Sequence, residues 1–585
     1  MPRSAMGKYY LSTSVKLVVT AVLTLIPTLA SSQTTSEKAT ENHEPGIPVT
    51  NQLVIAKCGK CHLQDAKGNL SRISWIRTTP EGWEEAIKRM VRLNSLVLEP
   101  DEARQILRYL SDSHGIAPSE AMPVENYAEH RMVDETFPGD PDVRHACGAC
   151  HAIARPLSWH RTPEDWKLLV NMHNAFFPSA APTSFVRENR RRDAAAEPAE
   201  HSQDTRTPLD KALEYIEKSA PLHTTAWSEW QAGMSAPKLA GRWLVRGEEP
   251  GKGKFFGVMT IAPGASAGQF TTKTTLNFVD GSSQVLTEEG SSIVYTGFQW
   301  RGRSTAQQTG ASPSDQKTAR EVMLVSNDQS QMEGRWFWGV YSEFGSDVNL
   351  RRANEGPTVL GTNISSLHAG SSGGHVTIYG DHLPQEIDAS AIDFGAGVKV
   401  TNVLSKSPDA ITVSVDVADD ATPGMRTITL GEAATPNAFA VYKSVDFIKV
   451  TPTESLAHLG SETHPKGYVQ FEAVGYSFGP DGKPDTADDI NLGPMPASWK
   501  LEEFYATYGD DDTQYVGTID AKSGLFSPAS DGPSPPRKSM RNNYGDVWAV
   551  ATVKPEGSTA PISGKSYLVV TVPQYLIYDQ PEVGQ

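Results

Sequence analysis

Two pentapeptides of the same pattern decide how this chain folds. Both follow Cys-x-x-Cys-His, and together they contain all four cysteines of the 585-residue chain: Cys58-Gly59-Lys60-Cys61-His62 and Cys147-Gly148-Ala149-Cys150-His151. In c-type cytochromes the two thiols of this pattern form thioethers to the porphyrin, and the histidine binds the iron. The sequence therefore predicts two covalently bound haem c groups, with His62 and His151 as the proximal iron ligands.

Two other chemistries use paired cysteines. A structural zinc site can be built from two Cys-x-x-Cys pairs, but it gives no reason for a histidine directly after each pair. A thioredoxin-like dithiol needs one pair in a βαβ setting and again does not need the histidine. Both remain alternatives to haem. In the haem interpretation no cysteine is left for a disulfide.

The N-terminus has the layout of a secretory signal. Lys8 and Lys16 precede an apolar run over residues 17–30, and Ala30-Ser31-Ser32-Gln33 supplies small residues for cleavage. The run is short for a membrane span and contains Pro27, although an uncleaved anchor is the alternative. We expect residues 1–32 to be a cleaved signal peptide. The mature chain is then expected in the periplasm, where haem c is attached, without a stable membrane span.

Length and charge limit the class of protein. A chain of 585 residues exceeds what one hydrophobic core organises, so several domains are expected. The net charge of -16 argues against binding to nucleic acid, whose phosphates require a basic face.

The region after each haem motif is repeated within the chain. Both copies have tryptophan, arginine and threonine at matching places, then Thr-Pro-Glu, which is typical of a helix start: Trp75-Ile76-Arg77-Thr78-Thr79-Pro80-Glu81 and Trp159-His160-Arg161-Thr162-Pro163-Glu164. An amphipathic helix follows in each copy. We expect an all-α dihaem cytochrome c domain over residues 45–230, built from two tandem units at about 45–125 and 135–225.

Matching positions of the repeat also indicate candidate distal iron ligands. The predicted helices contain Trp83 in the first unit and Trp166 in the second. Seven residues later the first unit has Met90 and the second has His173, and both residue types ligate haem iron. Each could instead be an ordinary residue of a helix face. In the first unit the competing ligands are Met122 and His114. In the second unit they are Met172 and His223. If Met90 and His173 are ligands, electrons should run from the His/His haem to the His/Met haem.

The two arginines of the repeat have two interpretations. Arg77 and Arg161 could pair with haem propionates, or they could be solvated surface arginines. The loop at 178–208 is interpreted as solvated, with a docking patch as the minority view.

The remainder of the chain predicts strands. Alternating segments and turn residues favour three all-β domains: an antiparallel barrel-like domain at 235–353, an immunoglobulin-like sandwich at 355–445 and a second sandwich at 446–585. No set of catalytic residues stands out in them. The loop at 481–489 has carboxylates at short spacing, and whether it binds calcium or is an ordinary acidic turn stays open.

This order of domains resembles the alpha subunit of quinohaemoprotein amine dehydrogenase. The resemblance rests on the paired haem motifs, the repeated Trp-x-Arg-Thr segments and the Gly-Arg-Trp sequences that begin at Gly241 and Gly334. It implies an oxidoreductase heterotrimer in which a small gamma subunit carries a cysteine tryptophylquinone and the beta subunit is a propeller. This chain has no spare cysteine for such a quinone. It would be the haem-bearing, non-catalytic subunit.

In that family the complex oxidises primary amines to aldehydes and ammonia. The resemblance implies that this subunit takes electrons from the quinone and passes them to an external carrier, such as a small cytochrome c or a blue copper protein. Two alternatives remain: a dihaem peroxidase, which would need an open iron position and an acid-base group, and a stand-alone dihaem electron shuttle.

Overall fold

The computed structural model describes most of the chain beyond the N-terminus. The described residues are 44–125, 139–148, 151–185, 205–279, 285–307, 318–505, 509–555 and 560–573. The expected signal peptide, Cys150 and most of the predicted solvated loop lie outside these ranges. Within them, no helix has the length and apolarity that a membrane span requires.

The first part of the chain is helical and carries both haem motifs. In chain order its helices are α1 (Gln52–Cys58), α2 (Pro80–Asn94), α3 (Pro100–Ser113), α4 (Pro118–Ala121), α5 (Pro141–Gly148), α6 (Ala154–Leu157), α7 (Pro163–Phe176), α8 (Pro208–Ser219) and α9 (Thr225–Gly233). The predicted helix starts are confirmed. Thr79 Oγ1 accepts from Gly82 N at 3.2 Å, and Thr162 Oγ1 accepts from Asp165 N at 3.3 Å.

The expectation that this N-terminal domain is all-α is wrong. Strands β1 (Ile76–Thr78) and β2 (Trp159–Arg161) pair antiparallel, with Arg77 opposite His160. Each strand is the repeated segment just before a Thr-Pro helix start, where the proline keeps the preceding residue extended. The extended backbone then needs hydrogen-bond partners, and each copy of the repeat supplies them to the other. The ribbon therefore joins the two units of the repeat.

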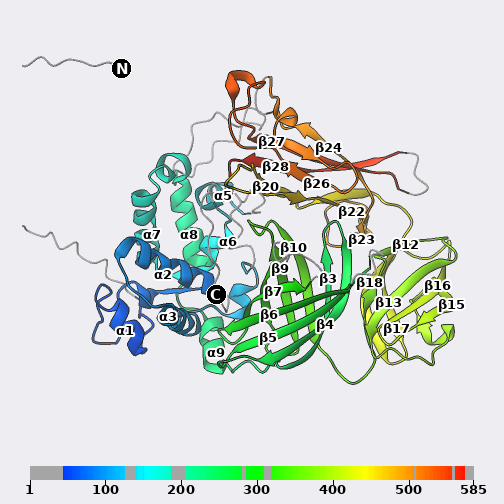
Figure 1. Ribbon diagram of the computed structural model, residues 1–585, viewed down its shortest axis with the longest axis horizontal. Helices are drawn as coiled ribbons and strands as arrows, with labels where there is room; N and C mark the ends of the chain where they lie inside the picture. The colour runs from blue at the N-terminus through cyan, green and yellow to red at the C-terminus, as the bar shows by residue number, and fades with distance from the viewer. Residues whose placement is uncertain are drawn as a thin grey trace, which may run out of the picture. The chain divides into compact units, whose positions relative to one another are not determined.

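The next part of the chain is a closed antiparallel barrel, in which each strand pairs with the next and β10 closes onto β3 (green in Figure 1). Its strands are β3 (Gly241–Glu249), β4 (Gly253–Pro263), β5 (Gln269–Phe278), β6 (Val285–Tyr295), β7 (Gln299–Gln307), β8 (Thr318–Val325), β9 (Gln331–Trp338) and β10 (Phe344–Arg352). Closure leaves no edge strand exposed. Aromatic residues such as Trp243 and Trp300 fill the interior, as expected for core.

Two four-stranded sheets follow the barrel and enclose one core. The first sheet contains, in spatial order, β11 (Thr358–Thr362), β13 (Gly374–Asp381), β16 (Ala410–Val417) and β15 (Val398–Lys406). The second contains β12 (Ser366–His368), β18 (Ala433–Tyr442), β17 (Gly424–Leu430) and β14 (Ile392–Asp393). Alternating residues such as Val376 and Ile378 point into this core.

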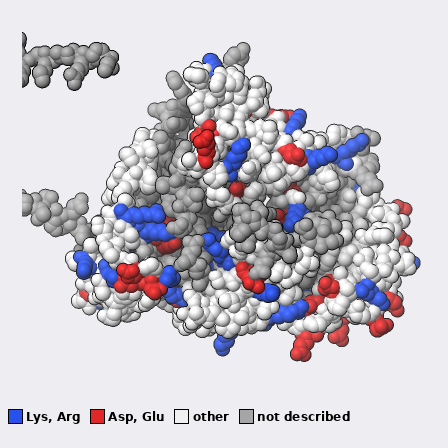
Figure 2. Space-filling view, in the orientation of Figure 1, with Lys and Arg blue, Asp and Glu red and all other residues white. Residues whose placement is uncertain are grey.

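The last part of the chain has three small sheets around one further core. They contain β19 (Phe447–Thr451), β22 (Glu472–Ser477) and β23 (Ile490–Pro494); β20 (Glu454–His458), β28 (Ile562–Thr571), β27 (Gly545–Val553) and β24 (Ser498–Glu503); and β21 (Val469–Gln470), β26 (Leu525–Pro528) and β25 (Gly517–Ile519). On the face shown in Figure 2, acidic and basic side chains are interspersed and do not form a basic field.

Candidate haem sites

The first motif forms a single turn at the end of α1. Cys61 N and His62 N both donate to Cys58 O, at 3.2 and 2.9 Å, which brings the three side chains to the same end of the helix. Cys58 is half-buried and Cys61 is exposed. Burial, with a smaller effect from Cys61, raises the pKa of the Cys58 thiol.

His62 is oriented as a haem ligand requires. Its Nδ1 lies 2.8 Å from Ser71 O. A carbonyl oxygen can only accept, so Nδ1 carries the proton and Nε2 presents its lone pair. A metal-bound histidine is commonly held in this way by a backbone carbonyl. Burial lowers the pKa of His62, which keeps the ring in the neutral form that binds a metal.

The second motif has the same arrangement where it is described. Cys147 lies in α5, and burial raises the pKa of its thiol to about 12. His151 Nδ1 donates to Ala152 O at 3.1 Å, so Nε2 is again the free nitrogen. Burial lowers the pKa of His151 to about 4. The donor set in both motifs, two thiols and one neutral imidazole, therefore fits a covalently bound haem.

No zinc site is assembled among the described residues of the two motifs. Among the described residues, three candidate ligand atoms approach within 4.8 Å of one another only at Asp510, Asp511 and Asp512. Arg537 and Arg541 form ion pairs with those carboxylates, so two positive charges already offset most of the three negative ones.

The structure brings His173 towards the second motif. His173 Nδ1 donates to Leu169 O at 2.9 Å, which frees Nε2, and the charge of His173 is among the causes that lower the pKa of His151. The competing ligands are engaged elsewhere. Met172 Sδ lies 3.1 Å from Arg89 Nη1, and His223 Nε2 lies 2.6 Å from Pro45 O.

The distal ligand of the first site is less defined. Met90 is half-buried on α2. His114 is fully buried with both ring nitrogens engaged, Nδ1 with Ser113 Oγ at 2.7 Å and Nε2 with Ile47 O at 3.1 Å. Met122 is 61% exposed on its own short helix. His114 is therefore a structural residue, and Met90 stays a prediction.

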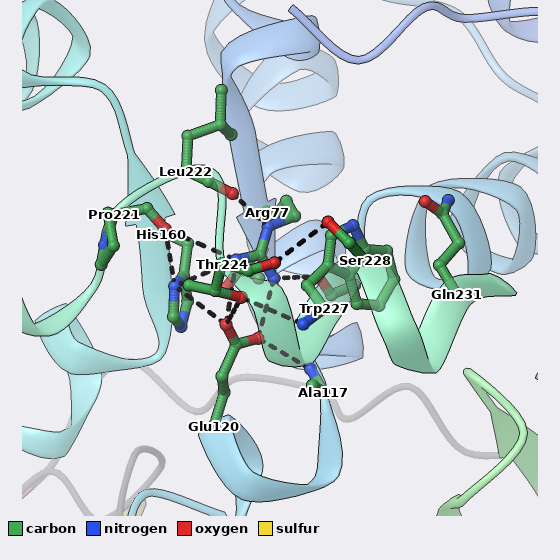
Figure 3. Close-up of polar contacts among 12 residues, drawn as sticks. Arg77, Ala117, Glu120, His160, Pro221, Leu222, Thr224, Trp227, Ser228 and Gln231 are labelled. Atoms are coloured by element: carbon green, nitrogen blue, oxygen red, sulfur yellow. Dashed lines mark hydrogen bonds and ion pairs between the residues drawn. The ribbon is translucent and has the colours of Figure 1, made fainter. Parts of the chain in front are cut away.

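Arg77 is one of the two repeat arginines, and its hydrogen-bond donors are occupied by groups of the protein. It is fully buried, and its Nε donates to Leu222 O at 2.6 Å and its Nη1 to Gly115 O at 3.1 Å. Nη1 and Nη2 also hold the two carboxylate oxygens of Glu120 at 2.8 and 3.0 Å (Figure 3). His160 lies beside the pair, with its Nδ1 3.3 Å from Arg77 Nη2. Neither sequence interpretation of Arg77, propionate partner or surface arginine, describes this environment.

The Arg77 cluster joins both repeat units to α9. Thr224 Oγ1 donates to Glu120 Oε1 at 2.6 Å, and Trp227 of α9 lies with its ring centroid 5.0 Å from the guanidinium carbon (Figure 3). Burial alone would raise the pKa of Glu120, but the hydrogen bonds and charge of Arg77 and the nearby His160 lower it to about 2. Sequence reasoning missed Glu120, Thr224 and His160, because no local pattern links them.

Arg161 occupies the matching place in the second unit with different neighbours. It is also buried, and its guanidinium carbon lies 4.5 Å from the Trp159 ring centroid and 5.5 Å from that of Trp166. No hydrogen bond joins its side chain to a described residue, and Nε is buried without an acceptor there. Burial lowers the pKa of Arg161 to about 9, with Asp165 opposing the shift.

The barrel holds the start of α2. Glu81, in the first turn of that helix, pairs with Arg301 of β7 and with Arg320 Nη2 of β8, the latter at 2.9 Å. Arg301 Nη1 also lies 3.6 Å from Glu125 Oε1. Burial raises the pKa of Glu125 to about 8 despite the charge of Arg301. The buried ion pairs of Glu81 fix the helix that carries Met90 against the barrel wall.

Several carboxylate oxygens in the acidic loop at 481–489 have partners within the protein. Asp481 Oδ1 accepts from Lys483 N at 2.9 Å, Asp489 Oδ2 accepts from Thr486 N at 2.9 Å, and Asp485 pairs with Lys449 at 2.8 Å. This is the hydrogen bonding of an acidic turn.

Four family models match the chain in succession. They are quinohemoprotein amine dehydrogenase A, alpha subunit, haem binding, at residues 49–212, and the alpha-subunit domains II, III and IV of quinohemoprotein amine dehydrogenase at 236–353, 357–443 and 448–583. The chain belongs to the quinohemoprotein amine dehydrogenase alpha-subunit family. The resemblance inferred from the paired motifs is thereby confirmed, and the haem-binding match includes both of them.

Other comparisons add little to this family assignment. No curated protein matches the chain. A redesigned beta barrel, mFAP0, bound to DFHBI is 16% identical, with a TM-score of 0.16, over 20% of this chain and 98% of its own. Drosophila N-cadherin EC1-4 is 9% identical, with a TM-score of 0.15, over 59% of this chain and 97% of its own. Scores this low carry no argument.

Proposed function

We propose that this chain is the dihaem electron-transfer subunit of a periplasmic quinohaemoprotein amine dehydrogenase. The observation that carries the proposal is the same in both motifs: a histidine directly after the cysteine pair donates Nδ1–H to a backbone carbonyl and leaves Nε2 free. Membership in the alpha-subunit family supports the rest, since that family is named for amine dehydrogenation and includes a haem-binding part.

The residues of the two motifs would hold the cofactors. Cys58 and Cys61 would attach one haem c and Cys147 and Cys150 the other, with His62 and His151 as proximal ligands. Met90 and His173 are the proposed distal ligands. When bound, each haem supplies a one-electron couple, whose potential depends on the axial ligands. The chain's own part is to orient the imidazoles and to exclude water around them.

The proposed complex has two further subunits. A small gamma subunit would carry the cysteine tryptophylquinone that oxidises the primary amine to an aldehyde and ammonia, and a propeller beta subunit would complete the heterotrimer. This chain would receive the electrons and pass them to a small cytochrome c or blue copper protein. Residues 1–32 would be removed during export. The proposed distal ligands Met90 and His173 would fill both sixth positions, whereas a peroxidase needs an open iron position.

Purification of the native complex tests the function. Extract from the host should yield this chain together with a small subunit that stains for quinone and a propeller subunit. Anaerobic addition of a primary amine should then reduce the haem absorption bands, whereas addition of peroxide alone should not oxidise a reduced donor. A chain that purifies alone, with haem bands that no primary amine reduces, would contradict the proposal.

The distal ligands have a separate test with a matched control. His173→Ala should convert one of the two haems from a low-spin to a high-spin spectrum, because it removes one axial ligand. His223→Ala removes a histidine that already bonds Pro45 O and should leave both spectra unchanged. Equal spectra in the two variants would remove His173 from the ligand set.

A further inference from the structure

Arg161 is a buried cation that the described protein does not neutralise by hydrogen bonding. Its side chain is 4% exposed, and no acceptor among the described residues bonds its Nε. Burying a charged group without a hydrogen-bonded partner costs several kcal/mol in proteins. Such a group is expected to have an anionic partner when the protein is complete.

The neighbours of Arg161 leave its hydrogen-bonding edge open. Trp159 and Trp166 contact the guanidinium through their rings, which attract a cation but offer no oxygen acceptor. Asp165 is the nearest carboxylate that acts on it, and its Oδ1 already accepts from Arg72 Nε at 3.1 Å. A planar fork of N–H groups that stacks on aromatic rings is suited to bidentate binding of a carboxylate.

The surrounding charge also favours an anion. Arg72 and Arg89 both act electrostatically on Arg161, so the surrounding arginines add to its positive charge. Positive groups of this density, shielded from water, stabilise a negative ligand placed among them.

The second haem is a candidate source of a carboxylate. Trp166, which contacts Arg161, and His173 are seven residues apart on α7. Seven residues are about two turns, or about 10.5 Å of helix, so both side chains lie on one helix face. A haem whose iron is bound by His173 would extend its edge along that face. The two propionates of haem are carboxylates.

We propose that Arg161 binds a propionate carboxylate of the haem held by the second motif. This inference rests on the proposed function, because it requires a haem at His151. Arg161 would be a positioning residue for that haem, and its positive charge would favour the reduced, less positive iron. Arg77 cannot act in this way for the first haem, since Leu222 O, Gly115 O and Glu120 occupy its donors.

Potentiometric titration of the purified holo-complex tests the proposal. Arg161→Gln should lower the reduction potential of one haem. The expected change is about tenfold in the redox equilibrium constant, which corresponds to about 59 mV for one electron. The propionate bands in the resonance Raman spectrum should shift together with it. Arg161→Lys keeps the charge without the fork and should restore most of the potential but not the Raman bands. Arg104→Gln, which removes an exposed arginine of the same domain, is the control for net charge.

The outcomes separate this proposal from the proposed function. If wild-type protein carries two haems and Arg161→Gln changes neither the potentials nor the Raman bands, the propionate contact is wrong while the electron-transfer role stands. A shift confined to the haem of the first motif, identified by its loss in His62→Ala, would overturn the assignment to the second haem. Wild-type protein without haem would overturn the proposed function itself.

Discussion

Arg77 and Arg161 hold the same place in two copies of one repeat, yet the protein treats them differently. Arg77 donates to two backbone carbonyls and to both oxygens of Glu120. Arg161, equally buried, has aromatic rings around it and no hydrogen bond to a described residue. The first arginine stabilises the junction of the two units. The second has no acceptor for its Nε among the described residues, which leaves it available for the propionate that we propose.

The comparison shows how a duplicated unit acquires two roles. Both arginines lie in the β1–β2 ribbon, where Ile76 is opposite Arg161 and Arg77 is opposite His160. Arg77 hydrogen-bonds a carboxylate, because α4 places Glu120 on its side of the ribbon. Asp165, the nearest carboxylate for Arg161, is held by Arg72 instead.

Substitution of Arg77 should have the largest effect. Arg77→Gln leaves Glu120 buried without its ion-pair partner, which typically costs about 3–5 kcal/mol. Urea unfolding of the purified haem-loaded chain, followed by haem absorbance, measures this loss. Arg161→Gln is the matched variant and should cost clearly less. Equal destabilisation by the two variants would contradict the claim that Arg77 stabilises the fold more than Arg161 does.

Glu120 should give the Arg77 cluster a defined pH dependence. Its pKa is about 2 in the folded chain against an ordinary 4.5, so its ion pair stabilises the fold fully above pH 4.5. That contribution, about 3 kcal/mol at 1.36 kcal/mol per unit of pKa, is lost as the pH falls through 2. Glu120→Gln should therefore be less stable than wild type at pH 7, and the gap should narrow below pH 4.5. A gap that stays constant from pH 7 to pH 3 would contradict the depressed pKa.

The helix tryptophans provide a smaller contrast. Trp83 Nε1 donates to His114 O at 2.9 Å, whereas Trp166 Nε1 is buried without an acceptor among the described residues. Trp83→Phe and Trp166→Phe remove the same volume, but only the first removes a hydrogen bond within the protein. We expect Trp83→Phe to cost about 1 kcal/mol more in the same unfolding experiment. Equal costs would show that Trp166 has a partner of similar strength.

Exchange of a distal ligand should sharpen the contrast between the two haems. Met90→His would replace a thioether by an imidazole and should lower the potential of one haem, which narrows the gap between the two couples. Potentiometric titration measures both couples at once. Unchanged couples would remove Met90 from the ligand set and, with it, the predicted direction of electron flow.

Local signals in the sequence predicted local structure well. The Thr-Pro starts of α2 and α7 lie where the cap and the proline placed them, because both act within one turn. Strands also occupy the alternating segments between 241 and 352. Whether those strands close into a barrel depends on β10 meeting β3, which no local pattern determines.

The errors came from contacts between distant segments. The all-α expectation failed because β1 pairs with a strand from the other repeat unit, and Arg77 and His160 are 83 residues apart. The roles of Arg77 and Arg161 could not be separated for the same reason, since Leu222 and Glu120 approach Arg77 only after folding. The haem motifs were recognisable because cysteines and histidine must be adjacent for their chemistry.

The mass of the mature chain tests the central claim most directly. Intact-mass spectrometry of the chain purified from its host should show two covalently attached haems, and Cys147→Ser/Cys150→Ser should show one. The haem that this variant retains would be the one attached at Cys58 and Cys61. A wild-type chain whose mass equals that of the bare polypeptide would contradict the account.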